Sequence, residues 1–123
     1  MDKKKTYIDI IIDKLTNSIE NVISGDVFDT EIIQMTSSNK NQIKKKEWLF
    51  DWNGEIEKQD RQVFKLVIRN NETIIQGLIS LSDNIDHIYM HLIESSKFNK
   101  GKTKLYLGVP GNLVAFACKY SFV

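Results

Sequence analysis

Residues 63–95 read VFKLVIRNNETIIQGLISLSDNIDHIYMHLIES, and this stretch decides the fold class. It contains three runs rich in β-branched and aromatic residues, a composition typical of strands: Val63–Arg69, Thr73–Ser82 and Asp86–Ser95. Asn70-Asn71 and Asp83-Asn84 separate the runs, and both pairs favour short turns. The stretch therefore predicts an antiparallel three-stranded meander.

Upstream of the meander, the sequence predicts a helix, a strand and a second helix. Residues Tyr7 to Ser24 carry apolar side chains at spacings of three and four, and Gly25 follows as a helix stop. Val27 to Thr36 is typical of a strand. A serine at position 37 or 38 can cap a lysine-rich helix that runs toward Trp48, and residues 48–60 are assigned as helix plus turn.

Downstream of the meander, a loop around Gly101 and the turn residues 108–112 lead into an apolar segment, Leu113 to Phe122. This segment predicts a helix with apolar residues on nearly every side, and such a helix must be buried on most sides. The sequence supplies no second covering layer after it. We therefore expect either a partner that covers this helix or a chain that is a shortened form of something longer.

Composition and charge exclude several classes of protein. The chain has 123 residues and no linker-like segment, which predicts a single domain over residues 1–123. Its longest apolar run is far shorter than the roughly 20 residues of a membrane span, so we expect a cytoplasmic protein without membrane contact. Cys118 is the single cysteine, which excludes an internal disulfide and a multi-cysteine zinc site. A net charge of +1 and only two arginines argue against nucleic-acid binding.

The order of these elements, together with three segments, resembles the GNAT superfamily of N-acetyltransferases. The segments are residues 75–81 (IQGLISL), 91–95 (HLIES) and 106–118 (YLGVPGNLVAFAC). The resemblance covers residues 1–123 and stops before the closing strand, helix and final strands of that fold. It implies an α+β fold with a mixed, mostly antiparallel sheet flanked by helices, truncated after the cofactor-binding helix. It also implies acetyl-CoA as co-substrate and an amine as acetyl acceptor.

In that family, a glycine-bearing loop that opens a helix binds the pyrophosphate of acetyl-CoA through backbone N–H groups. The resemblance places this role on five residues: Gly108, Val109, Gly111, Asn112 and Leu113. It also implies that the strand backbone at Leu92 and Ile93 orients the pantetheine. Pro110 replaces the second glycine of the family pattern, and Leu105 replaces its Gln or Arg. Because proline lacks an N–H, we expect weaker cofactor binding than a full motif gives.

Proton transfer points to the strand Asp86–Ser95. The attacking ammonium must lose a proton to a carboxylate or an imidazole, so Glu94 and His91 are the candidate catalytic residues. Strand alternation puts these two on opposite faces if no bulge intervenes. A purely structural role for both is an equally open interpretation. No metal site is expected, because His87 and His91 lie too far apart along a strand to share an ion.

Trp48, Asp51 and Trp52 fall in the segment that lines the acceptor site in that family, and the resemblance implies an aromatic and acidic pocket for a cationic amine. The alternative is that the tryptophans simply cover the sheet. Three functions stay open: an active N-acetyltransferase, a protein that binds acyl-CoA without turnover, and a small interaction protein. In the last case a partner or a second copy, as in a homodimer, would cover the apolar C-terminal helix.

Overall fold

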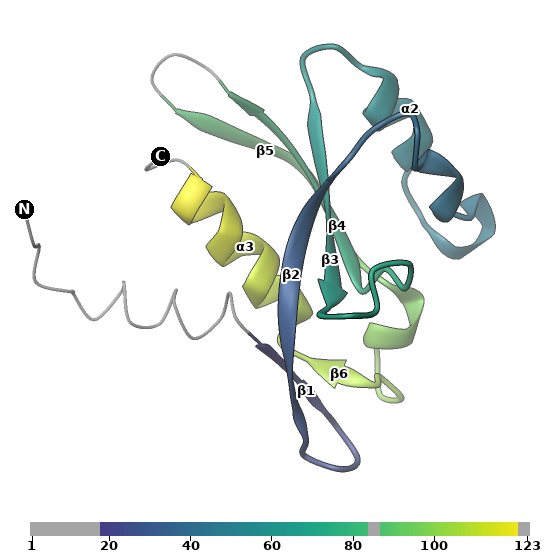
Figure 1. The fold of residues 1–123 in the computed structure, drawn as a ribbon, viewed down its shortest axis with the longest axis vertical. Helices are drawn as coiled ribbons and strands as arrows, with labels where there is room; N and C mark the ends of the chain where they lie inside the picture. The colour runs from purple at the N-terminus through teal and green to yellow at the C-terminus, as the bar shows by residue number, and fades with distance from the viewer. Residues whose placement is uncertain (1–17, 84–86, 121–123) are drawn as a thin grey trace, which may run out of the picture.

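The computed structural model describes residues 18–83 and 87–120, which form an α+β fold around one six-stranded sheet (Figure 1). The strand order is β5-β4-β3-β2-β1-β6. The strands are β1 (Ser18–Asn21), β2 (Val27–Met35), β3 (Gln62–Ile68), β4 (Gly77–Asp83), β5 (Ile88–Ser95) and β6 (Tyr106–Leu107). All pairs among these strands are antiparallel, so the expected mixture with parallel strands is not found in the described residues.

The predicted meander and the strand before it are confirmed. β3, β4 and β5 follow one another in antiparallel pairs, and β2 pairs with β3. β4 begins at Gly77 rather than Thr73, because the chain first turns at Asn70, whose φ of 73° is in the left-handed region. Lys65 reaches from β3 into this turn and donates to the carbonyl of Glu72 at 2.6 Å.

The predicted helix from Tyr7 to Ser24 is wrong where it can be compared. Its first part, up to residue 17, lies outside the described residues, whereas residues 18–21 form β1 between β2 and β6. Ile19 is 2% exposed in the core, but Ile23 is 89% exposed, so the helical spacing does not correspond to one buried face. Gly25, with φ of 74°, turns the chain between β1 and β2 instead of ending a helix.

The predicted lysine-rich helix is also wrong. Residues 37–48 form two short 3₁₀ helices, η1 (Lys40–Gln42) and η2 (Lys45–Glu47), joined by extended backbone at Ile43 and Lys44. Ile43 is buried at 5% exposure and is the only large apolar side chain between residues 40 and 47. A continuous helix needs an apolar stripe, and one isolated isoleucine does not provide it.

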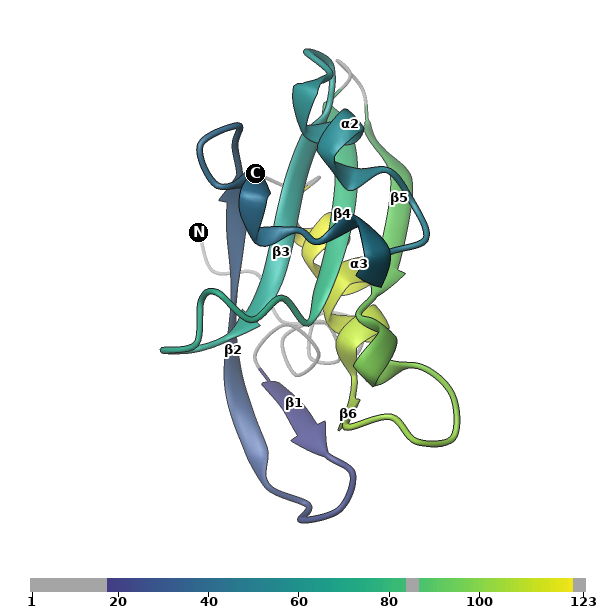
Figure 2. The same cartoon turned by 90° about the vertical axis from the view of Figure 1, so that its right-hand side faces the viewer.

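The two faces of the sheet carry different helices (Figures 1 and 2). Helix α2 (Trp52–Glu57), which confirms the helix predicted within residues 48–60, and the 3₁₀ segments lie on one face. Helix α3 (Val109–Tyr120) lies on the other. The α2 side buries Trp52 with Met35, Ile43, Val63 and Leu78. The α3 side buries Ile19, Phe64, Leu66, Ile68, Ile79, Leu81, Val109 and Leu113.

Helix α3 approaches the sheet most closely at Gly77. A Cβ at this position would lie 2.8 Å from Val109 Cγ1 and 2.9 Å from Leu113 Cδ1, so only glycine lets the helix rest there. The expectation that α3 is buried on most sides is wrong: Val114 is 42% exposed and Cys118 is exposed. No helix within residues 18–83 and 87–120 is long and apolar enough to cross a membrane.

Replacing Leu113 tests whether α3 stabilises the fold through this contact. Leu113 is fully buried, so Leu113→Ala should lower the free energy of unfolding by about 2–5 kcal/mol through lost apolar burial and a cavity. Val114→Ala on the exposed side of the same helix should cost less than about 1 kcal/mol. Urea denaturation of both variants checks this, and equal losses would contradict the observed orientation of the helix.

Candidate functional site

β5 carries a bulge at His91. Ser80 pairs with Leu92 and Leu81 pairs with Met90, so His91 is an extra residue in the register. Leu92 packs in the α2-side core, Ile93 packs in the α3-side core, and Glu94 reaches Trp52 on the α2 side. His91 contacts Ser82. Ser82 lies on the same face of β4 as Ser80, two residues earlier, and Ser80 donates a hydrogen bond to Glu55 of α2. Because of the bulge, His91 and Glu94 lie on the same face of the sheet. The expectation from regular strand alternation, which put them on opposite faces, is therefore wrong.

His91 is half-buried at the outer strand of the sheet. Its Nε2 lies 2.7 Å from the Ser82 hydroxyl oxygen, which fixes the orientation of the imidazole. The ring centroid lies 5.0 Å from that of Tyr89, which is 54% exposed. The imidazole is therefore held on two sides and still lies next to a solvent-accessible surface. This placement is compatible with a role in proton transfer.

Glu94 is buried at 4% exposure and is surrounded by donors. It accepts hydrogen bonds from Leu49 N at 2.8 Å, Phe50 N at 3.2 Å and Trp52 Nε1 at 2.9 Å. Lys100, from the loop after β5, is the fourth donor: its Nζ lies 3.0 Å from Glu94 Oε2 and forms an ion pair with it. Burial alone raises the pKa of Glu94, but these hydrogen bonds outweigh it and hold the pKa below the ordinary value. A carboxylate with this environment is a poor acceptor for a further proton.

The N-terminus of α3 lies beside the end of β5, because Ser95 pairs with Gly77. Gly108 has φ of 97°, a conformation that favours glycine, and turns the chain into the helix. The Asn112 N–H donates to the Gly108 carbonyl at 2.9 Å, and the Asn112 side chain donates to Ser18 and Gly108 carbonyls. The N–H groups of Val109 and Gly111 precede the first helical bond, but Val109 is 0% exposed, so the half-buried Gly111 is the one of the two that an anion can approach.

The remaining predicted site residues are dispersed. Val109, Asn112 and Leu113 are 0% exposed, backbone included, so a ligand cannot reach these three predicted cofactor-binding residues in this structure. Trp52 is 1% exposed beneath Glu94, which agrees with the interpretation that it covers the sheet. Asp51 caps α2 by accepting from Gly54 N at 3.2 Å. Leu92 and Ile93 lie on an edge strand, whose outer backbone groups no other described strand pairs.

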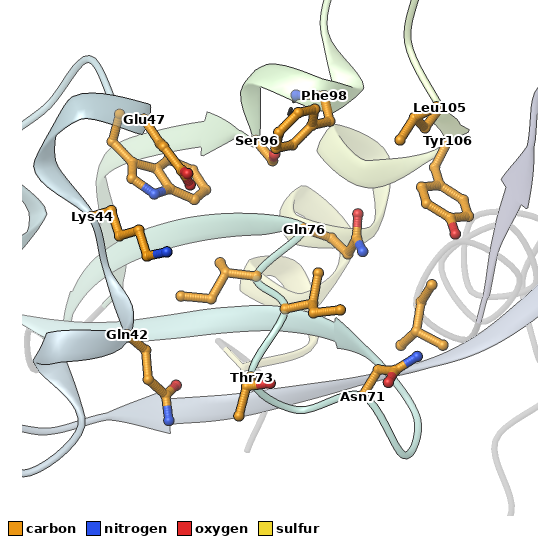
Figure 3. A pocket seen from close by; sticks show the side chains of 14 residues that line it. Gln42, Lys44, Glu47, Asn71, Thr73, Gln76, Ser96, Phe98, Leu105 and Tyr106 are labelled. Carbon is orange, nitrogen blue, oxygen red and sulfur yellow. Dashed lines mark hydrogen bonds between the residues drawn. The ribbon is translucent and has the colours of Figure 1, made fainter.

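Trp48 lines a pocket of about 350 Å³ that the sequence did not reveal (Figure 3). Four segments form it: residues 42–48, the loop before β4, the start of the loop after β5, and β6. Gln76 and Ser96 lie at its centre and upper wall, and Tyr106 faces them from β6. Only the aromatic character of Trp48 and the turn at Asn70-Asn71 mark any of these segments in the sequence.

No cluster of three histidine, cysteine, aspartate or glutamate side chains that could hold an ion occurs in the described ranges. Glu55, a second buried carboxylate, is engaged by Lys58, Ser80 and Arg61. Its surroundings are those of a structural ion pair under α2.

The hydrogen bonds to Glu94 make the free energy of unfolding depend on pH. Because the pKa of folded Glu94 lies below its ordinary value of 4.5, the carboxylate stabilises the fold at neutral pH. This contribution is lost as the pH falls from about 4.5 through the lower folded-state pKa. Glu94→Gln replaces one carboxylate oxygen with an NH2 group, which cannot accept hydrogen bonds from these donors. The substitution should therefore lower the free energy of unfolding by about 1–3 kcal/mol at pH 7.

Urea denaturation from pH 7 to pH 3 measures this effect. The Glu94→Gln variant should lose less stability on acidification than the wild type, because one titrating group is gone. Glu20→Gln, at an exposed position of β1, is the control for loss of one negative charge. Identical pH dependence of the wild type and Glu94→Gln would show that Glu94 is not stabilising as a carboxylate.

Comparison with known proteins gives this chain no relative. No family model, no curated protein and no solved structure matches it.

Proposed function

We propose that this chain is an N-acyltransferase that moves the acetyl group of acetyl-CoA to an amine. The observation that carries the proposal is that the N-terminus of α3, which follows a glycine, lies beside the edge strand β5, which contains a bulge. Gly108 opens α3 beside the end of β5, and His91 forms the bulge on that same strand. The fold is compatible with the resemblance drawn from the sequence.

Each part of this arrangement has a role in the proposed reaction. The N–H group of the half-buried Gly111, at the positive end of α3, donates to a pyrophosphate oxygen. The outer edge of β5 at Leu92 and Ile93 pairs with the amides of the pantetheine, as an added strand would. These contacts hold the thioester near the bulge, where its carbonyl faces the incoming amine.

His91 is the proposed proton acceptor. The neutral amine attacks the thioester carbonyl, the C–S bond breaks, and the proton released from the nitrogen passes through His91 to the departing thiolate. We assign Glu94 the role of a positioning residue, because its four donors and lowered pKa make it a poor base. It holds residues 49–52 against the end of β5.

A non-catalytic interaction protein is the second candidate. A groove between β5 and α3 is lined by Ile88, Met90, Val114, Ala117 and Cys118, and Met90 is 43% exposed. The only charged residue of β5 is the buried Glu94, so no charge on this edge strand opposes pairing with a second copy. This alternative requires no affinity for acetyl-CoA.

Binding of acetyl-CoA separates the two candidates. At a hundredfold excess over its dissociation constant, acetyl-CoA should stabilise the fold by about 2.7 kcal/mol, seen as a higher Tm. Gly111→Asp should abolish the shift by repelling phosphate, although a carboxylate in the first turn favours the helix itself. Asn41→Asp, an equal charge change at an exposed site, should keep the shift. A cooperatively folded wild type without any shift, and dimeric in sedimentation, would support the interaction protein.

Release of free thiol from acetyl-CoA in the presence of polyamines, amino acids or peptides tests catalysis. His91→Gln should lower kcat by about a hundredfold or more, the usual contribution of a positioned proton acceptor. His87→Gln, on the exposed side just before β5, should retain the rate. A His91→Gln variant with undiminished kcat would exclude the imidazole as the base.

A further inference from the structure

The pocket that Trp48 lines contains an amide donor without an acceptor in the described part of the chain. Gln76 is 7% exposed, and its Oε1 accepts from Asn99 Nδ2 at 2.9 Å. The same Asn99 amide donates to the Gln76 carbonyl at 3.1 Å, so the Gln76 side chain is fixed from behind. Its Nε2 meets no acceptor in the described part of the chain and points into the hollow (Figure 3). This N–H group at the pocket wall can donate to an oxygen of a ligand.

Two opposite charges line the same pocket. The Lys44 ammonium is directed into the hollow from one side (Figure 3), and no carboxylate within residues 18–83 and 87–120 forms an ion pair with it. Glu47 lines the pocket near Lys44, and it likewise forms no ion pair in that part of the chain. A ligand that carries one negative and one positive group would satisfy both side chains.

The lining also includes apolar side chains that are open to solvent. Ile74, Phe98 and Leu105 are 56%, 53% and 42% exposed although they border a concave surface. Trp48 and Tyr106 add aromatic surface from separate segments. A ligand that covers these side chains removes apolar surface from water, which favours binding. The volume of about 350 Å³ is at the small end of the range for small-molecule sites.

We propose that this pocket binds a free α-amino acid with an aromatic or large apolar side chain. The carboxylate of the ligand accepts from Lys44 and Gln76, its ammonium pairs with Glu47, and its side chain lies against Trp48 and Phe98. Neither His91 nor any residue of α3 lines this pocket, so this inference stands whether or not the chain transfers acetyl groups.

Titration of the ¹⁵N-labelled chain with L-tryptophan and L-phenylalanine tests the proposal. Both should produce saturable shifts of backbone amides within residues 42–48, 71–76 and 96–106. Phenethylamine lacks the carboxylate and 3-phenylpropionate lacks the ammonium, so each should bind at least about tenfold more weakly than L-phenylalanine.

Two substitutions assign the charges. Lys44→Met should weaken binding of L-tryptophan and of 3-phenylpropionate, but not of phenethylamine. Glu47→Gln should weaken binding of phenethylamine, but not of 3-phenylpropionate. Lys45→Met, at the exposed neighbouring lysine, should change affinity less than about twofold. Absence of saturation at about 10 mM of either amino acid overturns the proposal. Equal affinity for both analogues and the amino acid, or shifts confined to other residues, overturns it as well.

Discussion

The carboxylate of Glu94 is the contact on which the arrangement of the α2 face depends. A negative charge at 4% exposure has lost its hydration and must be surrounded by donors instead. Those donors come from two stretches of chain, residues 49–52 and the loop that holds Lys100. By drawing both toward the end of β5, one charged group sets where Trp52 covers the sheet and where Trp48 borders the pocket.

The predictable part of the fold is the part whose information is local. Residues 63–95 contain three runs rich in β-branched and aromatic residues, and the strands β3, β4 and β5 pair with their neighbours in the chain, so this meander needs no distant partner. In residues 18–21, Ile19 continues the helical spacing of the apolar residues before it, but the partners of this segment are β2 and the distant β6. Tertiary pairing overrides helical spacing there. Ile43 has a similar effect, since one buried side chain fixes the 3₁₀ segments on either side of it.

The candidate sites, too, could be predicted only where the signal lies in residues that are neighbours in the sequence. A glycine before an apolar helix is readable in the sequence, and Gly108 indeed has a positive φ at the start of α3. The position of His91 was not readable, because the bulge is a property of the register between β4 and β5 and has no glycine to mark it. The pocket was missed for a further reason. Its lining is gathered from four segments that share no spacing, and β6, which supplies Tyr106, pairs with β1 rather than with a strand of the meander.

The pairing of β1 with β6 also orders the events of folding. The Asn112 amide donates to the Ser18 carbonyl across 94 residues of sequence, and closing so long a loop costs entropy before any contact repays it. The meander can form from neighbours, but β1 has no partner on its outer edge until Tyr106 and Leu107 have left the ribosome. During synthesis, β1, the first strand within the described residues, therefore gains its outer neighbour only after β2, β3, β4 and β5 have been made.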